Sequence, residues 1–126
     1  MRKPNFKAPH LQTGEKGENI ACEYLLNKGF TLIEKNWRFK RTEIDIIAKE
    51  KDTVVFIEVK TRSNTKFGFP EVFVGVKKQK DICIAANHYL ESNNLDNKVR
   101  FDIIAINRIP NNWEIEHLED AFFPMV

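Results

Sequence analysis

Four charged side chains, Glu43, Asp45, Glu58 and Lys60, form two closely spaced pairs within neighbouring apolar segments. Both segments are expected to be strands of one hairpin, in which alternate side chains share a face. With a turn centred near residues 50 and 51, Glu43 faces Glu58 directly and Asp45 lies diagonal to it, about 7 to 8 Å away. The spacing therefore predicts three carboxylates and one amine on a single face.

Such a cluster has an electrostatic difficulty and a chemical use. Carboxylates this close raise one another's pKa unless a positive charge lies between them, and one lysine does not balance three acids. A divalent cation removes the conflict, because Mg²⁺ takes oxygen ligands from one or two carboxylates, keeps several waters and binds substrate phosphates. The pattern therefore indicates a metal-dependent phosphodiesterase site.

The same residues also fit two structural roles that need no metal. An isolated Glu-x-Lys is more often a solvated strand face, but Ile44, Ile46 and Ala48 are expected on the opposite face, so that the strand is apolar on both sides. Buried charges are paired or bind metal. A purely structural ion-pair network is therefore the main alternative to a metal site.

The rest of the chain predicts a sheet around this hairpin. The expected elements are a helix at 13–28, strands at 30–39, 42–49 and 53–62, a helix at 76–92, and strands at 99–107 and 113–118. The strand after the second helix is expected to lie parallel to the third strand, because that helix is a crossover connection. The order α-β-β-β-α-β-β predicts an α/β fold with a mixed sheet of about five strands flanked by helices.

Charged residues on both helices are candidates for the same site. Glu18 shares a helical stripe with Ala21, Cys22 and Leu25, so it lies on or beside the inward face. It either compensates the helix dipole or points at the acidic cluster. Lysines at the start of the second helix, near its free backbone N–H groups, are suited to contact a phosphate. The turn-rich segment 63–75 is expected to be a loop able to cover substrate.

Length and composition fit a single globular domain. The chain has 126 residues, 42% of them hydrophobic and 30% charged, which predicts one domain at 13–126 after a flexible basic arm at 1–12.

No apolar run approaches the roughly 18 residues of a membrane span, and no apolar signal segment follows the basic start. A cytoplasmic protein with no membrane partner is expected, in which Cys22 and Cys83 are buried thiols rather than a disulfide.

Charge is unevenly distributed along the chain. Residues 1–80 hold 17 Lys and Arg against 10 acids, a net charge of +7, whereas residues 81–126 hold 3 against 8, a net charge of −5. The basic part is also the part with the proposed site. This asymmetry suits capture of a polyanion, although lysines that serve only solubility would give the same count.

The motifs of this chain resemble a known family. They are Gly14-x-x-Gly17-Glu18, Ala21, Tyr24-Leu25, Gly29, Asn36-Trp37-Arg38, Glu43-Ile44-Asp45, Phe56-Ile57-Glu58-Val59-Lys60-x-Arg62, Phe67-Gly68, Lys78-Gln79 and Arg100-Phe101-Asp102. Together they resemble the YraN family of small endonuclease-like proteins, within the PD-(D/E)xK nuclease superfamily, and look most like archaeal Holliday-junction resolvases. The resemblance implies a restriction-endonuclease-like core and a symmetric dimer.

Roles are carried over by this resemblance to individual residues. It implies that Asp45 and Glu58 are metal ligands and that Lys60 is the amine that orients or activates water. Glu18 is implied to be an additional acid from the helix, and Gln79 matches a glutamine often seen near such sites.

The leading hypothesis is a Mg²⁺- or Mn²⁺-dependent nuclease acting on DNA that is branched or otherwise structured. Asp45, Glu58 and the Val59 carbonyl are expected to hold the cation, with Lys60 positioning a water for in-line attack. The expected nucleic-acid contacts are Arg38, Lys40, Arg41, Arg62, Lys66, Lys77 and Lys78.

One alternative is a nucleic-acid-binding module that uses the same groove without cutting. Another is a protein-interaction scaffold that uses the acidic and aromatic segment 113–123.

Overall fold

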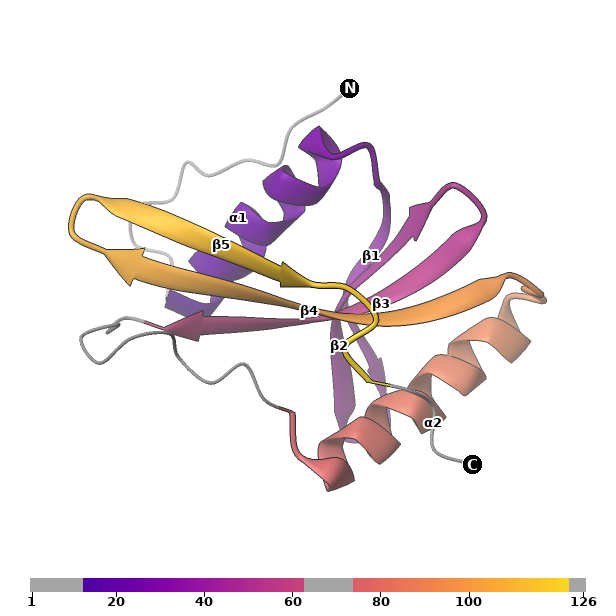
Figure 1. Ribbon diagram of the computed structural model, residues 1–126. Helices are drawn as coiled ribbons and strands as arrows, with labels where there is room; N and C mark the ends of the chain where they lie inside the picture. The colour runs from indigo at the N-terminus through magenta and orange to yellow at the C-terminus, as the bar shows by residue number, and fades with distance from the viewer. Residues whose placement is uncertain (1–12, 63–73, 123–126) are drawn as a thin grey trace.

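The computed structural model describes residues 13–62 and 74–122 (Figure 1). Its elements are α1 (Thr13–Asn27), β1 (Thr31–Phe39), β2 (Thr42–Glu50), β3 (Thr53–Arg62), α2 (Val76–Ser92), β4 (Lys98–Ile109) and β5 (Asn112–Leu118). The boundaries expected at 53–62 and 76–92 are confirmed, and the others agree within two residues. The arm expected at 1–12 and most of the loop expected at 63–75 lie outside the described residues.

The five strands form one mixed sheet in chain order. β3 and β4 are parallel, as expected for strands joined by a crossover helix, and the other neighbouring strands are antiparallel. α1 covers one face of the sheet and α2 the other (Figure 1). The predicted α/β architecture and its order of elements are therefore confirmed.

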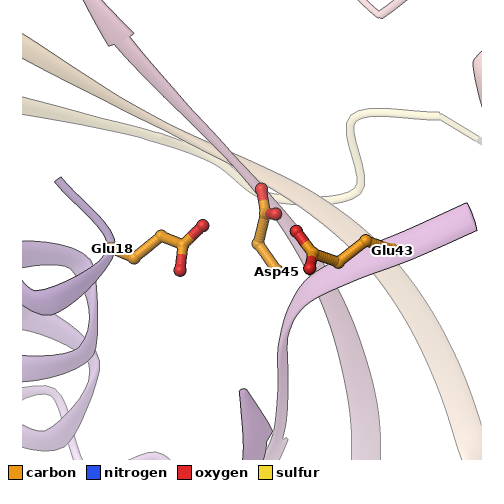
Figure 2. A group of neighbouring side chains, drawn as sticks. All are labelled: Glu18, Glu43 and Asp45. Atoms are coloured by element: carbon orange, nitrogen blue, oxygen red, sulfur yellow. The ribbon is translucent and has the colours of Figure 1, made fainter. Parts of the chain in front are cut away.

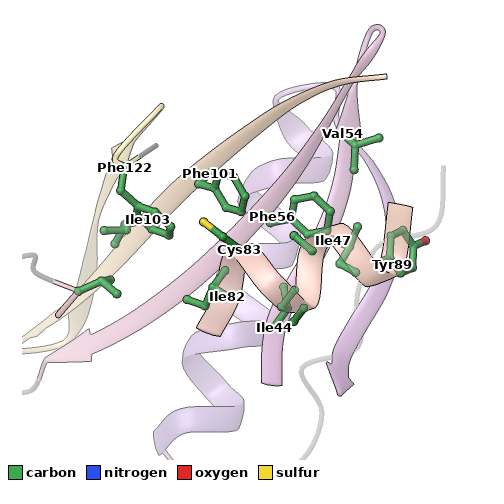
Figure 3. Close-up of a cluster of buried hydrophobic side chains, with 13 residues drawn as sticks. Ile44, Ile47, Val54, Phe56, Ile82, Cys83, Tyr89, Phe101, Ile103 and Phe122 are labelled. Carbon is green, nitrogen blue, oxygen red and sulfur yellow. The ribbon is translucent and has the colours of Figure 1, made fainter. Parts of the chain in front are cut away.

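Each helix buries an apolar stripe against its own face of the sheet. On the α1 side, Ala21, Cys22 and Leu25 pack against the strands. On the α2 side, Ile82 and Cys83 lie among aromatic and branched side chains of the strands (Figure 3). Both cysteines are buried and they form no disulfide with each other, as predicted.

The chain leaves α1 through Gly29, whose φ of +95° is easily reached only without a side chain. The next backbone N–H, that of Phe30, then donates to the Leu25 carbonyl at 3.0 Å. This stop directs the chain into β1 at the edge of the sheet.

The register of the β2–β3 hairpin differs from the expected one by two residues. Glu50 pairs with Thr53 and Ile46 with Ile57, so the turn is Lys51-Asp52 rather than residues 50 and 51. The prediction that Glu43 faces Glu58 directly is therefore wrong. A shift of two residues keeps the face of each side chain and moves Asp45, rather than Glu43, nearest to Glu58.

The side chains of β2 also stop alternating near Asp45. Ile46 and Ala48 pack in the α1-side core, but Ile44 packs in the α2-side core, so the expectation that all three share one face is wrong. Pairing with β3 extends only to Ile46, while pairing with β1 continues to Ile44 and beyond. β2 therefore separates from β3 at Asp45 and turns its side chains there.

No helix in the described part of the chain is long and apolar enough to cross a membrane.

Candidate metal and phosphate site

Asp45 lies at the point where β2 and β3 separate. Its Oδ2 accepts a hydrogen bond of 2.8 Å from the backbone N–H of Val59. The side chain therefore takes a ladder donor of β3 that the diverging backbone of β2 no longer meets. This contact fixes the carboxylate in the opening between the two strands.

Two further carboxylates approach Asp45. Glu18, Glu43 and Asp45 each place one oxygen so that the three atoms lie within 4.8 Å of one another. Figure 2 shows the side chains of Glu18, from α1, and Glu43, from β2, both pointing toward Asp45. Three half-buried acids from two elements thus face one small volume.

Glu18 reaches this volume because α1 lies unusually close to β3. Gly17 is buried, and a Cβ added to it would overlap Thr61 Oγ1, so the helix could not approach so closely with a side chain there. Asn36, whose φ is +52°, donates from Nδ2 to Glu18 Oε1 at 2.8 Å. Burial raises the pKa of Glu18, and this hydrogen bond only partly opposes the effect.

Glu58 is the fourth acid, and it has a basic partner. Its side chain is 5% exposed and forms an ion pair with the Lys78 amine, from the first turn of α2. Burial disfavours the charged amine, but the hydrogen bond to Glu58 and its charge raise the pKa of Lys78. Burial and the nearby Glu58 together raise the pKa of Asp45 to about 8, despite the hydrogen bond from Val59. In the metal-free cluster, burial and the neighbouring acid thus favour the protonated form of Asp45.

An open cavity of about 600 Å³ adjoins the acids. Its lining residues are Arg41, Thr42, Glu43, Asp45, Gly75, Lys77, Lys78 and Asp81. Three basic side chains thus share a cavity with two of the clustered carboxylates. A phosphate is the kind of group that such a cavity can bind beside a cation.

The structure brings most of the expected acids together, with one change of partner. Glu18, Asp45 and Glu58 gather at the opening between the strands. Lys60 is half-buried, and alternation along β3 puts it on the face that carries Glu58. The amine that pairs with Glu58 is nevertheless that of Lys78, which the sequence suggested only as a phosphate contact.

Three other expected site residues have partners within the described part of the protein. Gln79 Nε2 donates to the Val74 carbonyl at 2.7 Å, and its side chain lines a separate cavity. Its role beside the acids stays a prediction. Val59 meets Asp45 through its N–H. Arg38 is paired with Glu43 at 3.4 Å.

The remaining expected phosphate contacts are spread over several elements. Arg41 and Lys77 line the cavity beside the acids, and Lys40 lines an adjoining cavity. Arg62 is half-buried at the end of β3. Lys66 lies outside the described residues.

Sequence reasoning missed two parts of the site. The sequence pattern puts Glu43 in the acidic cluster without predicting that it is a ligand, although its oxygen lies with those of Glu18 and Asp45. Asn36 appeared only within a motif, with no role. The available signal is an asparagine inside an expected strand, because asparagine is among the few residues that readily adopt the left-handed conformation seen here.

A second buried polar network lies away from the acids. Asp102 is fully buried and accepts hydrogen bonds from Arg100, at 2.8 and 2.9 Å, and from the Asp120 backbone N–H, at 3.0 Å. His117 Nε2 lies 2.7 Å from Asp102 Oδ2, and its Nδ1 lies 3.1 Å from the Tyr24 hydroxyl. Burial alone would raise the pKa of Asp102, but these hydrogen bonds hold it below its usual value. The network joins α1, β4 and β5.

Part of the segment proposed as an interaction scaffold packs into the fold. Within 113–123, Trp113 and Phe122 pack against the two cores, and Phe123 lies outside the described residues. The aromatic side chains that suggested a scaffold therefore belong, where described, to the fold itself.

Comparison with known proteins identifies the family. The sequence model described as "Uncharacterised protein family UPF0102" matches residues 17–106. The UPF0102 protein of Christiangramia forsetii is 47% identical over 116 residues, which cover 92% of this chain and 98% of that protein. The chain belongs to the UPF0102 family. The motif-based resemblance to YraN is thereby confirmed.

Other UPF0102 relatives are similar over the same length. The protein of Flavobacterium psychrophilum is 45% identical, covering 92% of this chain and 98% of the relative. That of Clostridioides difficile is 46% identical, covering 88% and 96%. Among solved structures, the chain is similar to Pyrococcus furiosus SfsA in complex with Ca²⁺, with 12% identity and a TM-score of 0.39. That match covers 85% of this chain and 62% of the other, so this chain spans less than two thirds of that protein.

Proposed function

We propose that this UPF0102 protein is a Mg²⁺- or Mn²⁺-dependent nuclease that hydrolyses phosphodiester bonds in branched or otherwise structured DNA. The supporting observation is the convergence of Glu18, Glu43 and Asp45 oxygens within 4.8 Å, beside a cavity with three basic side chains. Acids that gather at the mouth of a basic cavity match the needs of phosphoryl chemistry, in which both a cation and an anionic substrate must be held.

The donor set fits a hard divalent cation. Carboxylate oxygens are the ligands that Mg²⁺ and Mn²⁺ prefer. The pKa of about 8 at Asp45 reflects burial and, after it, the negative charge of Glu58, which a cation would relieve. Glu18, Glu43 and Asp45 would hold the ion. Once bound, it would neutralise charge on the phosphate and lower the pKa of a coordinated water.

The basic side chains have separate roles in this proposal. Arg41 and Lys77 bind the phosphate in the cavity, because both line it and both are exposed. Lys60 orients the attacking water from the face of β3 that carries Glu58. Lys78 neutralises Glu58, so Glu58 becomes an additional ligand only when that ion pair opens.

Cleavage of a labelled four-way junction tests the function. We expect wild-type protein to nick the junction in Mn²⁺ and to lose all detectable nicking in EDTA. Asp45→Asn and Glu18→Gln should lower the rate by about 100-fold or more, since each removes a charged ligand. Glu91→Gln, an exposed acid of α2, serves as the matched control and should cut normally. Absence of nicking, or nicking that survives Asp45→Asn, would contradict the proposal.

A second function is favoured by the Lys78–Glu58 ion pair. This pair neutralises the most buried acid of the site without any metal. Such an ion pair suits a structural role, in a protein that binds nucleic acid in the same groove and does not cut it. Junction binding without nicks, unchanged in Asp45→Ala, would support the module. A duplex of equal length distinguishes a preference for branches from general affinity for DNA.

A further inference from the structure

A second cavity, of about 380 Å³, continues the candidate site along α2. It lies between that helix and the turn that joins β1 to β2. Both cavities are lined by Arg41, Thr42, Lys77 and Asp81, so they form one groove that begins at the acids. The far part of this groove, which contains Phe39, Lys40 and Ile84 but none of the clustered acids, is called the outer groove below.

The outer groove has an apolar surface. Ile84 is 58% exposed, although it lies in the middle of α2. Phe39, at the end of β1, is half-buried, and its ring stacks on that of His88 with centroids 4.2 Å apart. Single exposed apolar residues are ordinary on protein surfaces. Here an aromatic ring with a fixed neighbour and an exposed isoleucine line the same cavity.

The charges around this apolar surface are positive. Lys40, Arg41 and Lys77 line the outer groove, and Asp81 is the one acid among the described residues that do so. Asp81 is paired with Lys77 at 3.2 Å, which leaves Lys40 and Arg41 as the uncompensated charges of the lining. The Lys40 amine lies over the Phe39 ring, 5.3 Å from its centroid. The groove therefore presents a flat apolar surface with cations at its rim.

Few ligand groups match both features. A nucleotide does, because its base has a flat face that stacks on aromatic and apolar side chains while its phosphate pairs with lysine or arginine. Bases within a duplex are stacked on each other and are not free for such a contact. The exposed Lys40 side chain can leave the ring when a base arrives, and its amine is then close to that nucleotide's phosphate.

We propose that the outer groove binds an unpaired nucleobase of the substrate against Phe39 and Ile84, with Lys40 and Arg41 on its phosphate. This inference rests on the proposed nuclease function, and it specifies substrates with a single-stranded segment next to the bond that is cut. A base held there would orient the strand along α2 toward the acids.

Binding of two single-stranded oligonucleotides tests the inference. One carries thymine at every position, and the other has the same length and phosphates but abasic sites throughout. Fluorescence anisotropy in EDTA should show at least about fivefold tighter binding of the thymine strand by wild-type protein, the lower limit expected for one stacked base. Ile84→Ala should bring the two affinities toward equality while leaving the abasic strand unaffected.

A matched control is available on the same helix. Val76 is 55% exposed and is not one of the described residues that line the outer groove. Val76→Ala should therefore retain the preference for bases. Phe39→Leu should act like Ile84→Ala, and circular dichroism melting of each variant checks that the fold is intact. Because Ile84 is mostly exposed, its variant tests the groove even if Phe39→Leu unfolds.

Several results would overturn the inference. They are equal affinity of wild type for the two strands, no binding of either, an equal loss for both strands in Ile84→Ala, or the same loss in Val76→Ala. The assay uses no metal and no cleavage, so its failure would leave metal-dependent hydrolysis standing. Conversely, a clear base preference in a protein that never cuts would leave the outer groove and remove the nuclease.

Discussion

The Asp45 carboxylate accepts a hydrogen bond from the Val59 backbone N–H at 2.8 Å, where the ladder between β2 and β3 has ended. A buried backbone donor without an acceptor is costly, so this side chain stabilises the separation of the strands. The same separation opens the space into which Glu18 and Glu43 point. One residue thus joins the architecture of the sheet to the chemistry of the site.

Stability of the metal-free protein should fall as pH rises, and Asp45 should be the cause. Its pKa is about 8 in the folded protein against 3.8 ordinarily, so between these values the folded state keeps a proton that the unfolded state has lost. The stabilising contribution is complete below about pH 4 and is lost as pH rises through about 8. Urea unfolding in EDTA should show that Asp45→Asn flattens this decline and is more stable than wild type at pH 9, by about 1 to 3 kcal/mol. Parallel pH curves for the two proteins would contradict the assignment.

Gly17→Ala should separate α1 from β3 and weaken the site. The new Cβ would overlap Thr61 Oγ1, and we expect a loss of about 1 to 3 kcal/mol in the free energy of unfolding, together with weaker Mn²⁺ binding as Glu18 moves away. Adding Thr61→Ala removes Oγ1 and leaves Thr61 Cβ at 3.3 Å, so it should restore much of both properties. Gly75→Ala, which meets nothing within 4 Å, should cost less than about 1 kcal/mol. Equal costs at the two glycines would show that packing against Thr61 is unimportant.

Lys78→Met should destabilise the protein more than Lys77→Met, although the two lysines are adjacent. Lys78 pairs with Glu58, which is 5% exposed, and its removal leaves that carboxylate without its cation at a cost of about 1 to 3 kcal/mol. Lys77 is 90% exposed and pairs with Asp81 on the same helix, which predicts a change below about 0.5 kcal/mol. Chemical denaturation in EDTA measures the difference. A Lys78→Met variant as stable as Lys77→Met would show that the pair is dispensable.

Asp102→Ala should unfold the protein readily without acting through the metal site. Its loss leaves Arg100 and His117 without their shared carboxylate, and we expect a cost of about 3 to 5 kcal/mol. Because the pKa of Asp102 is lowered on folding, its contribution is present above about pH 4 and is lost as pH falls through the lowered value. Asp96→Ala, at an exposed position, is the control for thermal melting between pH 3 and 7. A melting temperature for Asp102→Ala close to that of the control would contradict this role.

The helices and strands follow closely from local sequence signals. Apolar runs locate β2 and β3, Gly29 ends α1, and the stripe through Ala21, Cys22 and Leu25 places Glu18 toward the sheet. These features depend on the spacing of apolar residues along the sequence and on single residues that permit a turn. They could therefore be predicted without knowing any distant contact.

The details of the site depend on contacts that periodicity does not encode. The Lys51-Asp52 turn is not one of the Asn-Gly or Asp-Gly pairs that announce a hairpin register, which explains the error of two residues. The change in side-chain alternation at Asp45 occurs where that residue accepts a hydrogen bond from the Val59 backbone N–H, a contact between distant positions of the chain. Lys78 lies twenty positions along the chain from Glu58. The two side chains pair only because α2 packs across the sheet.

Calorimetric titration of Mn²⁺ into metal-free protein at pH 8 tests the central claim most directly, namely that Glu18, Glu43 and Asp45 hold one cation. We predict saturable uptake by wild type and by Glu91→Gln, and an affinity lowered roughly tenfold or more in each of Glu18→Gln, Glu43→Gln and Asp45→Asn. Absence of uptake by wild type, or equal affinity in all three variants and wild type, would contradict the account.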